Sequence, residues 1–165
     1  VLSMVGCGAE KESLKLGMGV HAYINGSADA DADNNGNAEV VATVAAVLVD
    51  KDGKIVKCEI DTLDATVAFT SEGKAVAADG FKTKAELGSD YGMVAYSGAT
   101  KEWYEQADAF EEVAVGKTAA EVEAIKTQEA KGHQIAVDKA LLDAGCSMQI
   151  TGMQAAIAQA ATNAR

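Results

Sequence analysis

Two apolar runs on either side of an Asp-Gly turn constrain the fold of this chain more than any other feature. The run EVVATVAAVLVD occupies residues 39–50, and KIVKCEID follows at 54–61, after Asp52-Gly53. Asp-Gly between two apolar runs is the strongest short-range signal for a β-hairpin, because both residues tolerate positive φ. The first run is apolar on both faces, as in a central strand that is covered on two sides. The sequence therefore predicts an antiparallel sheet with residues 39–50 at its centre.

Further strands are expected around this hairpin. The segment GVHAYI at 19–24 has strand character, and a polar loop of Asn, Asp, Gly and Ala follows it. Along the run 54–61, Val56, Cys58 and Ile60 are expected to face one side of the sheet, with charged residues facing the other. The runs ATVAFT and KAVAA, separated by Ser-Glu-Gly, predict a second hairpin.

The second half of the chain has helical patterns. The capping boxes TKAE at 83–86 and TAAE at 118–121 predict two helix starts. Helices are also expected over 101–115 and near the C-terminus, because apolar residues recur there at helical spacing. These stripes consist of Trp103, Ala107, Phe110 and Ala114, and of Met153, Ala156, Ile157 and Ala160. Strands first and helices later predict an α+β fold, an antiparallel sheet packed against helices, in one domain over residues 16–165.

The composition indicates a soluble globular protein with a core of small side chains. Of the 165 residues, 48% are hydrophobic and only 5% aromatic, and there is no proline. The few large core residues are expected to be Phe69, Phe81, Trp103, Tyr104 and Phe110. The formal net charge is −11, with 14 scattered basic residues, which argues against nucleic acid as a partner because phosphate binding needs clustered Lys and Arg.

The N-terminal stretch VLSMVGCGAEKES changes abruptly from apolar to polar at Cys7. It resembles the end of a bacterial lipoprotein signal peptide, in which a small residue precedes the cysteine that receives lipid. The resemblance implies that residues 1–6 are removed, Cys7 is lipidated and residues 8–15 form a tether. The protein would then be extracytoplasmic and lipid-anchored to the bacterial cell membrane. The alternative is a buried strand that starts at Val1, with Cys7 as a small core residue.

Cys58 and Cys146 form an even pair once Cys7 is assigned to lipid. An extracytoplasmic location permits a disulfide between them, while Cys58 on an apolar strand face is equally consistent with core packing. The two histidines, His21 and His133, have no ligand-like spacing, so no metal site of Cys/His type is predicted.

The polar loop at 31–36, DADNNG, matches the first six positions of a calcium-binding loop. Glu39 falls on the ninth position, but the twelfth, which should supply a bidentate carboxylate, is Ala42. The loop is therefore either a weak calcium site or simply the acidic tip of a hairpin.

The stretch YSGATKEWYEQ places a glycine-containing turn before the expected helix at 101–115. Together with the hairpin VAAVLVDKDGKIVKCEID, it resembles the FMN-binding domains of bacterial membrane-anchored flavoproteins, over residues 37–164. These proteins include the C subunit of the sodium-pumping NADH:quinone reductase and lipoproteins of extracellular electron transfer. In that family, a motif Asp-x-x-Ser/Thr-Gly-Ala-Thr opens a helix, and a flavin transferase joins its threonine to FMN through the phosphate.

The resemblance implies an FMN site at the last four positions of this motif, with the threonine as the acceptor. These residues are Ser97, Gly98, Ala99 and Thr100, while Val94 stands where the family has aspartate. A second segment, DAGCSMQITGMQAAIAQA, lies where the family usually has its motif, before the last helix. Its Asp143 matches the aspartate, but Gln149 replaces the acceptor threonine. Alternatively, Ser97 and Thr100 serve only as N-caps of the following helix.

Two functions of different kinds follow from these features. One is a flavin-binding or electron-transfer module with a redox partner in the cell envelope. The other is a non-enzymatic envelope binding or interaction protein that keeps the scaffold without the flavin. No Ser/His/Asp or Cys/His arrangement is evident, and the pair Glu111-Glu112 is expected on a solvated helix face, so no catalytic residue is predicted.

Overall fold

A computed structural model describes residues 13–130 and 132–165 of the chain. The predicted lipidation site at Cys7 and most of the predicted tether lie outside the described residues. The first strand begins at Lys15, the last residue assigned to that tether. None of the helices in the described part of the chain is long and apolar enough to cross a membrane.

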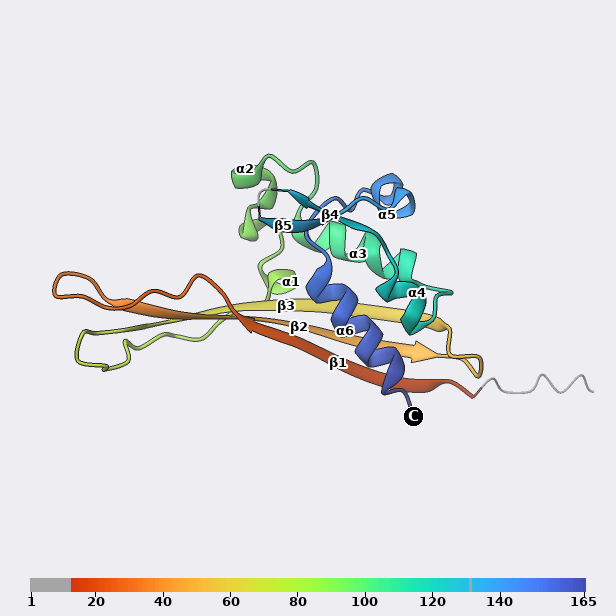
Figure 1. Cartoon of the computed structure of the whole chain (residues 1–165), viewed down its shortest axis with the longest axis horizontal. Coiled ribbons are helices and arrows are strands. Elements are labelled where there is room, and N and C mark those ends of the chain that lie inside the picture. The colour runs from red at the N-terminus through yellow and green to blue at the C-terminus, as the bar shows by residue number, and fades with distance from the viewer. Residues whose placement is uncertain (1–12, 131) are drawn as a thin grey trace, which may run out of the picture.

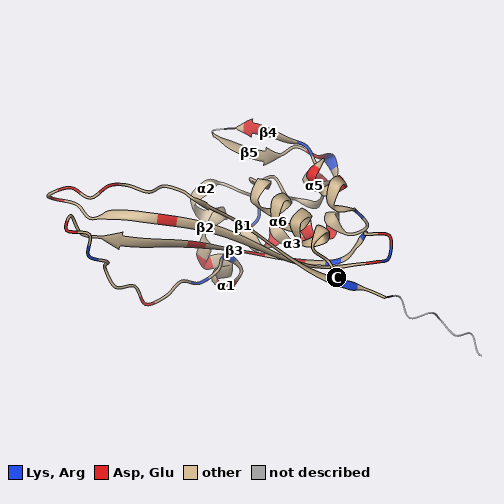
Figure 2. Ribbon diagram, turned by 60° about the horizontal axis from the view of Figure 1, so that its bottom comes forward, with Lys and Arg blue, Asp and Glu red and all other residues tan. Residues whose placement is uncertain are grey.

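The first half of the chain forms a three-stranded antiparallel sheet, and the second half supplies most of the helices, which confirms the predicted α+β fold. The strands are β1 (Lys15–Ile24), β2 (Gly36–Val49) and β3 (Ile55–Phe69), in the order β1-β2-β3. Residues 39–50 were correctly predicted to form the central strand. Acidic residues are found on the extended end of the sheet and along helix α3 (Trp103–Ala114) (Figure 2).

Short helices follow the sheet and are covered by a small second hairpin. The helices are α1 (Lys84–Leu87), α2 (Met93–Ser97), α3 (Trp103–Ala114), α4 (Ala119–Glu123), α5 (Lys139–Ala144) and α6 (Thr151–Thr162), with a 3₁₀ turn at Gly88–Tyr91; the hairpin pairs β4 (Thr127–Ala130) with β5 (His133–Ala136). Both predicted capping boxes are present, at Thr83 and Thr118. Helices α3 and α6 lie over one face of the sheet, which extends beyond them (Figure 1).

Strand β3 differs from the prediction in length and in phase. The runs KIVKCEID and ATVAFT form one continuous strand, and ATVAFT turns back at Thr70 to make only a single bridge, Phe69 to Ala75. A bulge opposite Leu48 and Val49 leaves Val56 without a partner on β2. Val56 is therefore 43% exposed, whereas Ile55 takes the inward position that the alternation assigned to Val56.

The core lies between the inner face of the sheet and helices α3 and α6. As predicted, Trp103, Phe110 and the stripe of α6 are buried in it. The prediction was wrong for Phe81, which is 44% exposed, and for Tyr104, which is also exposed. Neither lies on the face of an element that meets the sheet.

The contact between α6 and β1 depends on glycine. A Cβ atom at Gly17 would overlap the carbonyl oxygen of Ala160, and a Cβ at Gly19 would overlap that of Ala156. The helix therefore rests directly on the strand backbone. Its Asn163 and Gln159 also bond to the free edge of β1, from Asn163 Nδ2 to the Met18 carbonyl and from the Val20 amide to Gln159 Oε1. These contacts satisfy backbone groups that an edge strand would otherwise expose.

The opposite face of the sheet is apolar and uncovered over β1 and β2. Since glycines 17 and 19 face the helix, the even-numbered residues of β1, which alternate with them, face outward, and all of the larger ones are exposed. They are Leu16, Met18, Val20 and Ile24, beside Val40 and Val44 of β2. The expectation that β2 is covered on two sides was therefore wrong: Val40 and Val44 are each 37% exposed, because the helices lie on one face of the sheet.

The substitution Gly19→Ala should destabilise the fold strongly, because the added methyl must displace α6 from β1. We expect a loss of about 2 kcal/mol or more in the free energy of unfolding, measured by urea denaturation. The matched control is Val20→Ala on the exposed face of the same strand, for which the change should be within about 0.5 kcal/mol. Equal losses for the two variants would contradict the close helix–strand contact.

Helix α3 blocks the free edge of β3 through Glu111. The amide of Ile60 donates a hydrogen bond to Glu111 Oε1 over 2.6 Å. Burial raises the pKa of Glu111 to about 7, and the neighbouring Glu59 and Asp108 add to the shift against the opposing effect of this hydrogen bond. Ionisation of Glu111 in the folded state is therefore unfavourable.

This raised pKa gives stability a defined pH dependence. The folded state binds the Glu111 proton more tightly than the unfolded state, so stability falls as the pH rises from about 4.5 through about 7. The variant Glu111→Gln keeps an acceptor for Ile60 and should be more stable than the parent at pH 8, by about 1 kcal/mol after allowance for solvent screening. The difference should vanish near pH 4.5, as measured by denaturant melts, and the exposed control Glu123→Gln should show no such trend.

Candidate functional site

A cavity of about 360 Å³ lies between the sheet and the helical layer. Its volume falls within the ~300–1,000 Å³ typical of small-molecule sites. Strands β1, β2 and β3 supply one wall and the starts of α3 and α6 supply another. Residues that represent these walls are Tyr23, Val41, Trp103, Met148 and Met153. The lining is thus mostly apolar and aromatic, with a few polar groups among them.

Two threonines place hydroxyl groups on the sheet wall of the cavity. Thr43 and Thr62 are directly opposite each other on β2 and β3, and both side chains are buried. Their hydroxyl oxygens are 2.8 Å apart and form a hydrogen bond. Because a hydroxyl can both donate and accept, this pair retains capacity to bond to a ligand.

Lys84 brings a positive charge to the cavity. Its Nζ atom lies 3.1 Å from Asp64 Oδ2, 4.8 Å from the centre of the Tyr91 ring and 5.8 Å from the centre of the Trp103 ring. Burial lowers the pKa of Lys84, but contact with Tyr91 and the charge of Asp64 outweigh that effect, so the pKa lies above its usual value. The side chain therefore carries a full positive charge at neutral pH.

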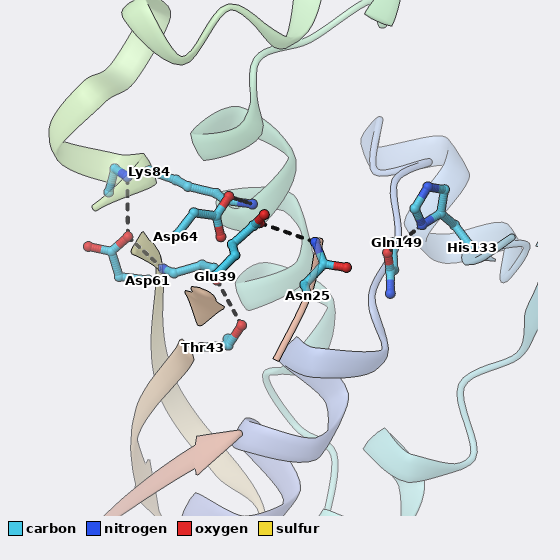
Figure 3. A network of polar contacts seen from close by, with 10 residues as sticks. Asn25, Glu39, Thr43, Asp61, Asp64, Lys84, His133 and Gln149 are labelled. Carbon is cyan, nitrogen blue, oxygen red and sulfur yellow. Dashed lines mark hydrogen bonds and ion pairs between the residues drawn. The ribbon is translucent and has the colours of Figure 1, made fainter. Parts of the chain in front are cut away.

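The two segments that resemble the flavin attachment motif converge on this cavity. Ser97, from the first segment, and Met148 and Gln149, from the second, all line it. Gln149 Oε1 lies 2.9 Å from His133 Nδ1 on β5, and both side chains are exposed, so this side of the cavity is open to solvent (Figure 3). Segments about fifty residues apart in the sequence thus share one site.

The remaining residues of the predicted FMN site lie apart from the cavity lining. Gly98 ends α2 in a left-handed conformation, with φ 72°, and the Ala99 amide donates to the Ser97 hydroxyl. Thr100 is exposed. Asp143 is exposed on α5, where it forms an ion pair with Lys139.

The Ser-Gly-Ala-Thr turn does not open a helix, contrary to the prediction. Ser97 is the last residue of α2, and its hydroxyl donates to the Met93 carbonyl. Helix α3 begins only at Trp103, where Glu102 and Glu105 form the capping box. Ser97 and Thr100 are therefore not its N-caps, and the turn lacks the helix N-terminus that favours phosphate binding in the family motif.

Gln106 links the two motif segments through hydrogen bonds to the backbone in or beside them. This buried side chain of α3 accepts hydrogen bonds from the amides of Ser147 and Met148 through Oε1, at 3.0 and 3.1 Å. Its Nε2 atom donates to the Lys101 carbonyl over 3.0 Å, and it lies 3.1 Å from Met93 Sδ. One side chain thus fixes the backbone after the first segment, the backbone of the second, and a cavity-lining methionine.

The two cysteines are buried in the core, and internal hydrogen bonds stabilise the acidic loop. Cys58 and Cys146 are buried free thiols, and burial raises the pKa of Cys58 to about 12 and that of Cys146 to about 11. In the loop at 31–36, Asp31 Oδ1 accepts hydrogen bonds from the amides of Asp33 and Asn34, which is how a tight polar turn is stabilised. Within residues 13–130 and 132–165, no group of three or more His, Cys, Asp or Glu side chains is placed to hold a metal ion.

Several residues of the site were not predicted from the sequence. Lys84 was noted only as part of a capping box, and Thr43 only as part of an apolar run. A detectable signal existed for Gln106, since it lies three residues after Trp103 and therefore on the buried stripe of α3. A polar residue at a core position must find hydrogen-bond partners, and here these are the two motif segments.

The chain is similar to a curated protein named chlorophenol reductase, from Desulfitobacterium hafniense. The two are 42% identical over an alignment of 96 residues, and the match covers 50% of this chain and 29% of that protein. The matched stretch thus spans less than a third of the relative. No protein-family model matches the chain, and no solved structure matches it. The resemblance to FMN-binding domains therefore stays a prediction.

Replacing Gln106 should destabilise the fold and affect most strongly the backbone amides that bind its side chain. In Gln106→Leu, the buried amides of Ser147 and Met148 lose their acceptor, and we expect a loss of about 2–3 kcal/mol in the free energy of unfolding. Hydrogen exchange should accelerate at these two amides in particular. The control is Gln128→Leu, at an exposed position of β4, which should leave exchange at the same amides unchanged. Unaltered protection in Gln106→Leu would contradict the joining role.

Proposed function

We propose that this chain is a redox module of the bacterial cell envelope that binds a flavin non-covalently in the cavity beside Trp103. A reductase catalyses a redox reaction, so the partial likeness to a protein with that name supports a redox-related role. The resemblance of the N-terminal stretch to a lipoprotein signal supports the envelope location, and the resemblance to FMN-binding domains supports the cofactor class.

One observation carries the proposal: the two degenerate motif segments meet at the same cavity. Ser97 comes from one segment and Gln149 from the other, and both contribute to its lining. If the two short segments resembled the motif only by chance, they would have no reason to lie at the same cavity. Their convergence is what a binding site assembled from both of them requires.

The residues of the cavity fit a flavin. Trp103 and Tyr91 provide aromatic surface for a planar ring, and the Thr43–Thr62 pair and Lys84 provide polar partners for one edge of that ring. A bound flavin would supply electron transfer, while these residues bind and orient the ring. Such binding is non-covalent in our proposal, because Thr100 is exposed outside the lining and Gln149 has no hydroxyl.

The open face of the sheet favours a second candidate function. Leu16, Met18 and Val20 present a row of exposed apolar side chains on β1, and such surfaces often mark interaction sites. In this alternative, the chain is an envelope binding or interaction protein that retains the scaffold without a flavin.

Binding of FMN to the purified protein distinguishes the two functions. We expect saturable binding at one site per chain by calorimetry, and release of all flavin on denaturation. The variant Ser97→Phe fills the edge of the cavity and should weaken binding at least tenfold. The adjacent control Tyr96→Phe alters a side chain that is 89% exposed, and it should bind as the parent does. Absence of FMN binding by a folded parent protein would leave the interaction function.

The mode of attachment is tested in a host that also makes a flavin transferase. On a denaturing gel, the parent protein and Thr100→Ala should both lack flavin fluorescence, because the flavin is not covalently bound. A fluorescent parent band that disappears in Thr100→Ala would instead establish covalent attachment at Thr100.

The proposed membrane anchor predicts a change of location on loss of the lipid acceptor. With the natural precursor expressed in a bacterial host, the parent should fractionate with membranes, and Cys7→Ser should appear in the periplasm or medium. The exposed control Ser89→Ala should remain with the membranes. Unchanged membrane partitioning of Cys7→Ser would contradict lipidation at this residue.

A further inference from the structure

Lys84 is the one lysine or arginine that the cavity lining contains within the described part of the chain. Its side chain is only 14% exposed, although it belongs to a helix of four residues at the edge of the sheet. Burying an ammonium group is costly unless it is paired, so a surface lysine would ordinarily turn outward. Here the capping box at Thr83 fixes the start of α1, and the side chain points toward Asp64 (Figure 3).

Asp64 holds the ammonium group in place. Its Oδ2 atom pairs with Lys84 Nζ, while its Oδ1 atom is buried and has no hydrogen-bond partner among the described residues. The Ala85 amide, next along α1, donates to Asp61 Oδ1 over 3.2 Å, which ties the helix backbone to the same strand. An ammonium group has three N–H donors. Asp64 engages one of them in an ion pair and the Tyr91 ring lies against the ammonium, so donor capacity remains for a group inside the cavity.

The surroundings of Lys84 define what that group can be. The rings of Tyr91 and Trp103 flank the ammonium, and they favour a flat ligand. The positive charge at the cavity wall favours a ligand whose ring carries negative charge. Because the Lys84 side chain is only 14% exposed, such a pair interacts more strongly than it would in bulk solvent.

We propose that Lys84 selects planar ring ligands whose edge carries delocalised negative charge, with Asp64 as the residue that positions it. This inference rests on the proposed function, in that it assigns the ligand class of the same cavity. Two sources share this chemistry. One is the flavin ring, which becomes anionic on taking up two electrons and one proton. The other is a phenolate, the deprotonated form of the chlorophenol after which the similar reductase is named.

For a flavin, the consequence is a shift in redox potential. The oxidised ring is neutral and the reduced ring is negatively charged, so Lys84 stabilises the reduced form and raises the potential. The test is Lys84→Met, which keeps most of the length of the unbranched side chain and removes the charge. We expect its affinity for reduced FMN to fall at least tenfold more than its affinity for oxidised FMN. For a two-electron couple, this lowers the potential by about 30 mV, measured at an electrode with a soluble mediator.

For a phenolate, the probe is 2,4,6-trichlorophenol, compared with its neutral methyl ether. We expect Lys84→Met to lose at least tenfold in affinity for the phenolate and to leave affinity for the ether unchanged. Two matched variants complete the design. Lys84→Arg keeps the charge and should restore selectivity, and Lys82→Met removes an exposed lysine two residues away and should have no effect. Thermal melts establish that each variant is folded.

The outcomes separate this inference from the proposed function. Flavin binding by the parent, with an equal effect of Lys84→Met on both redox forms, would overturn the inference and leave the flavin function intact. Lys84-dependent binding of the phenolate without flavin binding would support the inference and overturn the flavin function. Binding of neither probe by the folded parent would overturn both.

Discussion

Direct contact between helix α6 and the backbone of β1 is the constraint on which the rest of the structure depends. It exists because Gly17 and Gly19 have no side chains where Ala160 and Ala156 approach. The same contact fixes how closely the start of α6 approaches the sheet. Gly152, in the first turn of the helix, lies close to Thr43 on β2. Had the helix stood farther from the sheet, the space beside Thr43 would be an open groove rather than a cavity.

The cavity also depends on a second, lateral constraint. Gln106 holds the chain after α2 and the chain before α6 at the start of α3, so the walls contributed by two distant segments keep a fixed separation. Glu102 strengthens this arrangement, because its carboxylate accepts hydrogen bonds from the first amides of α2 while it caps α3. Short helices that would be unstable alone are thus ordered by polar contacts with their neighbours.

The parts of the fold that could be predicted from the sequence are those governed by local interactions. The Asp52-Gly53 hairpin and the capping boxes at Thr83 and Thr118 depend on residues within a few positions of one another, and all three are present. The phase of β3 was wrong at Val56 because a bulge is set by the register with β2. The prediction that the turn at Ser97 opens a helix was wrong, because Glu102, rather than Ser97 or Thr100, caps α3. The cavity itself could not be predicted, since its lining is assembled by tertiary contacts. Polar residues in buried patterns, such as Gln106, were the available signal.

The burial of the two core thiols has a consequence for their reactivity. A cysteine reacts with oxidants and disulfides as its thiolate, and both Cys58 and Cys146 are held in the protonated form far above neutral pH. Neither sulfur would exchange with glutathione or trap a stray electrophile while the domain stays folded. Burial thus leaves these two thiols unreactive for as long as the fold keeps solvent from them.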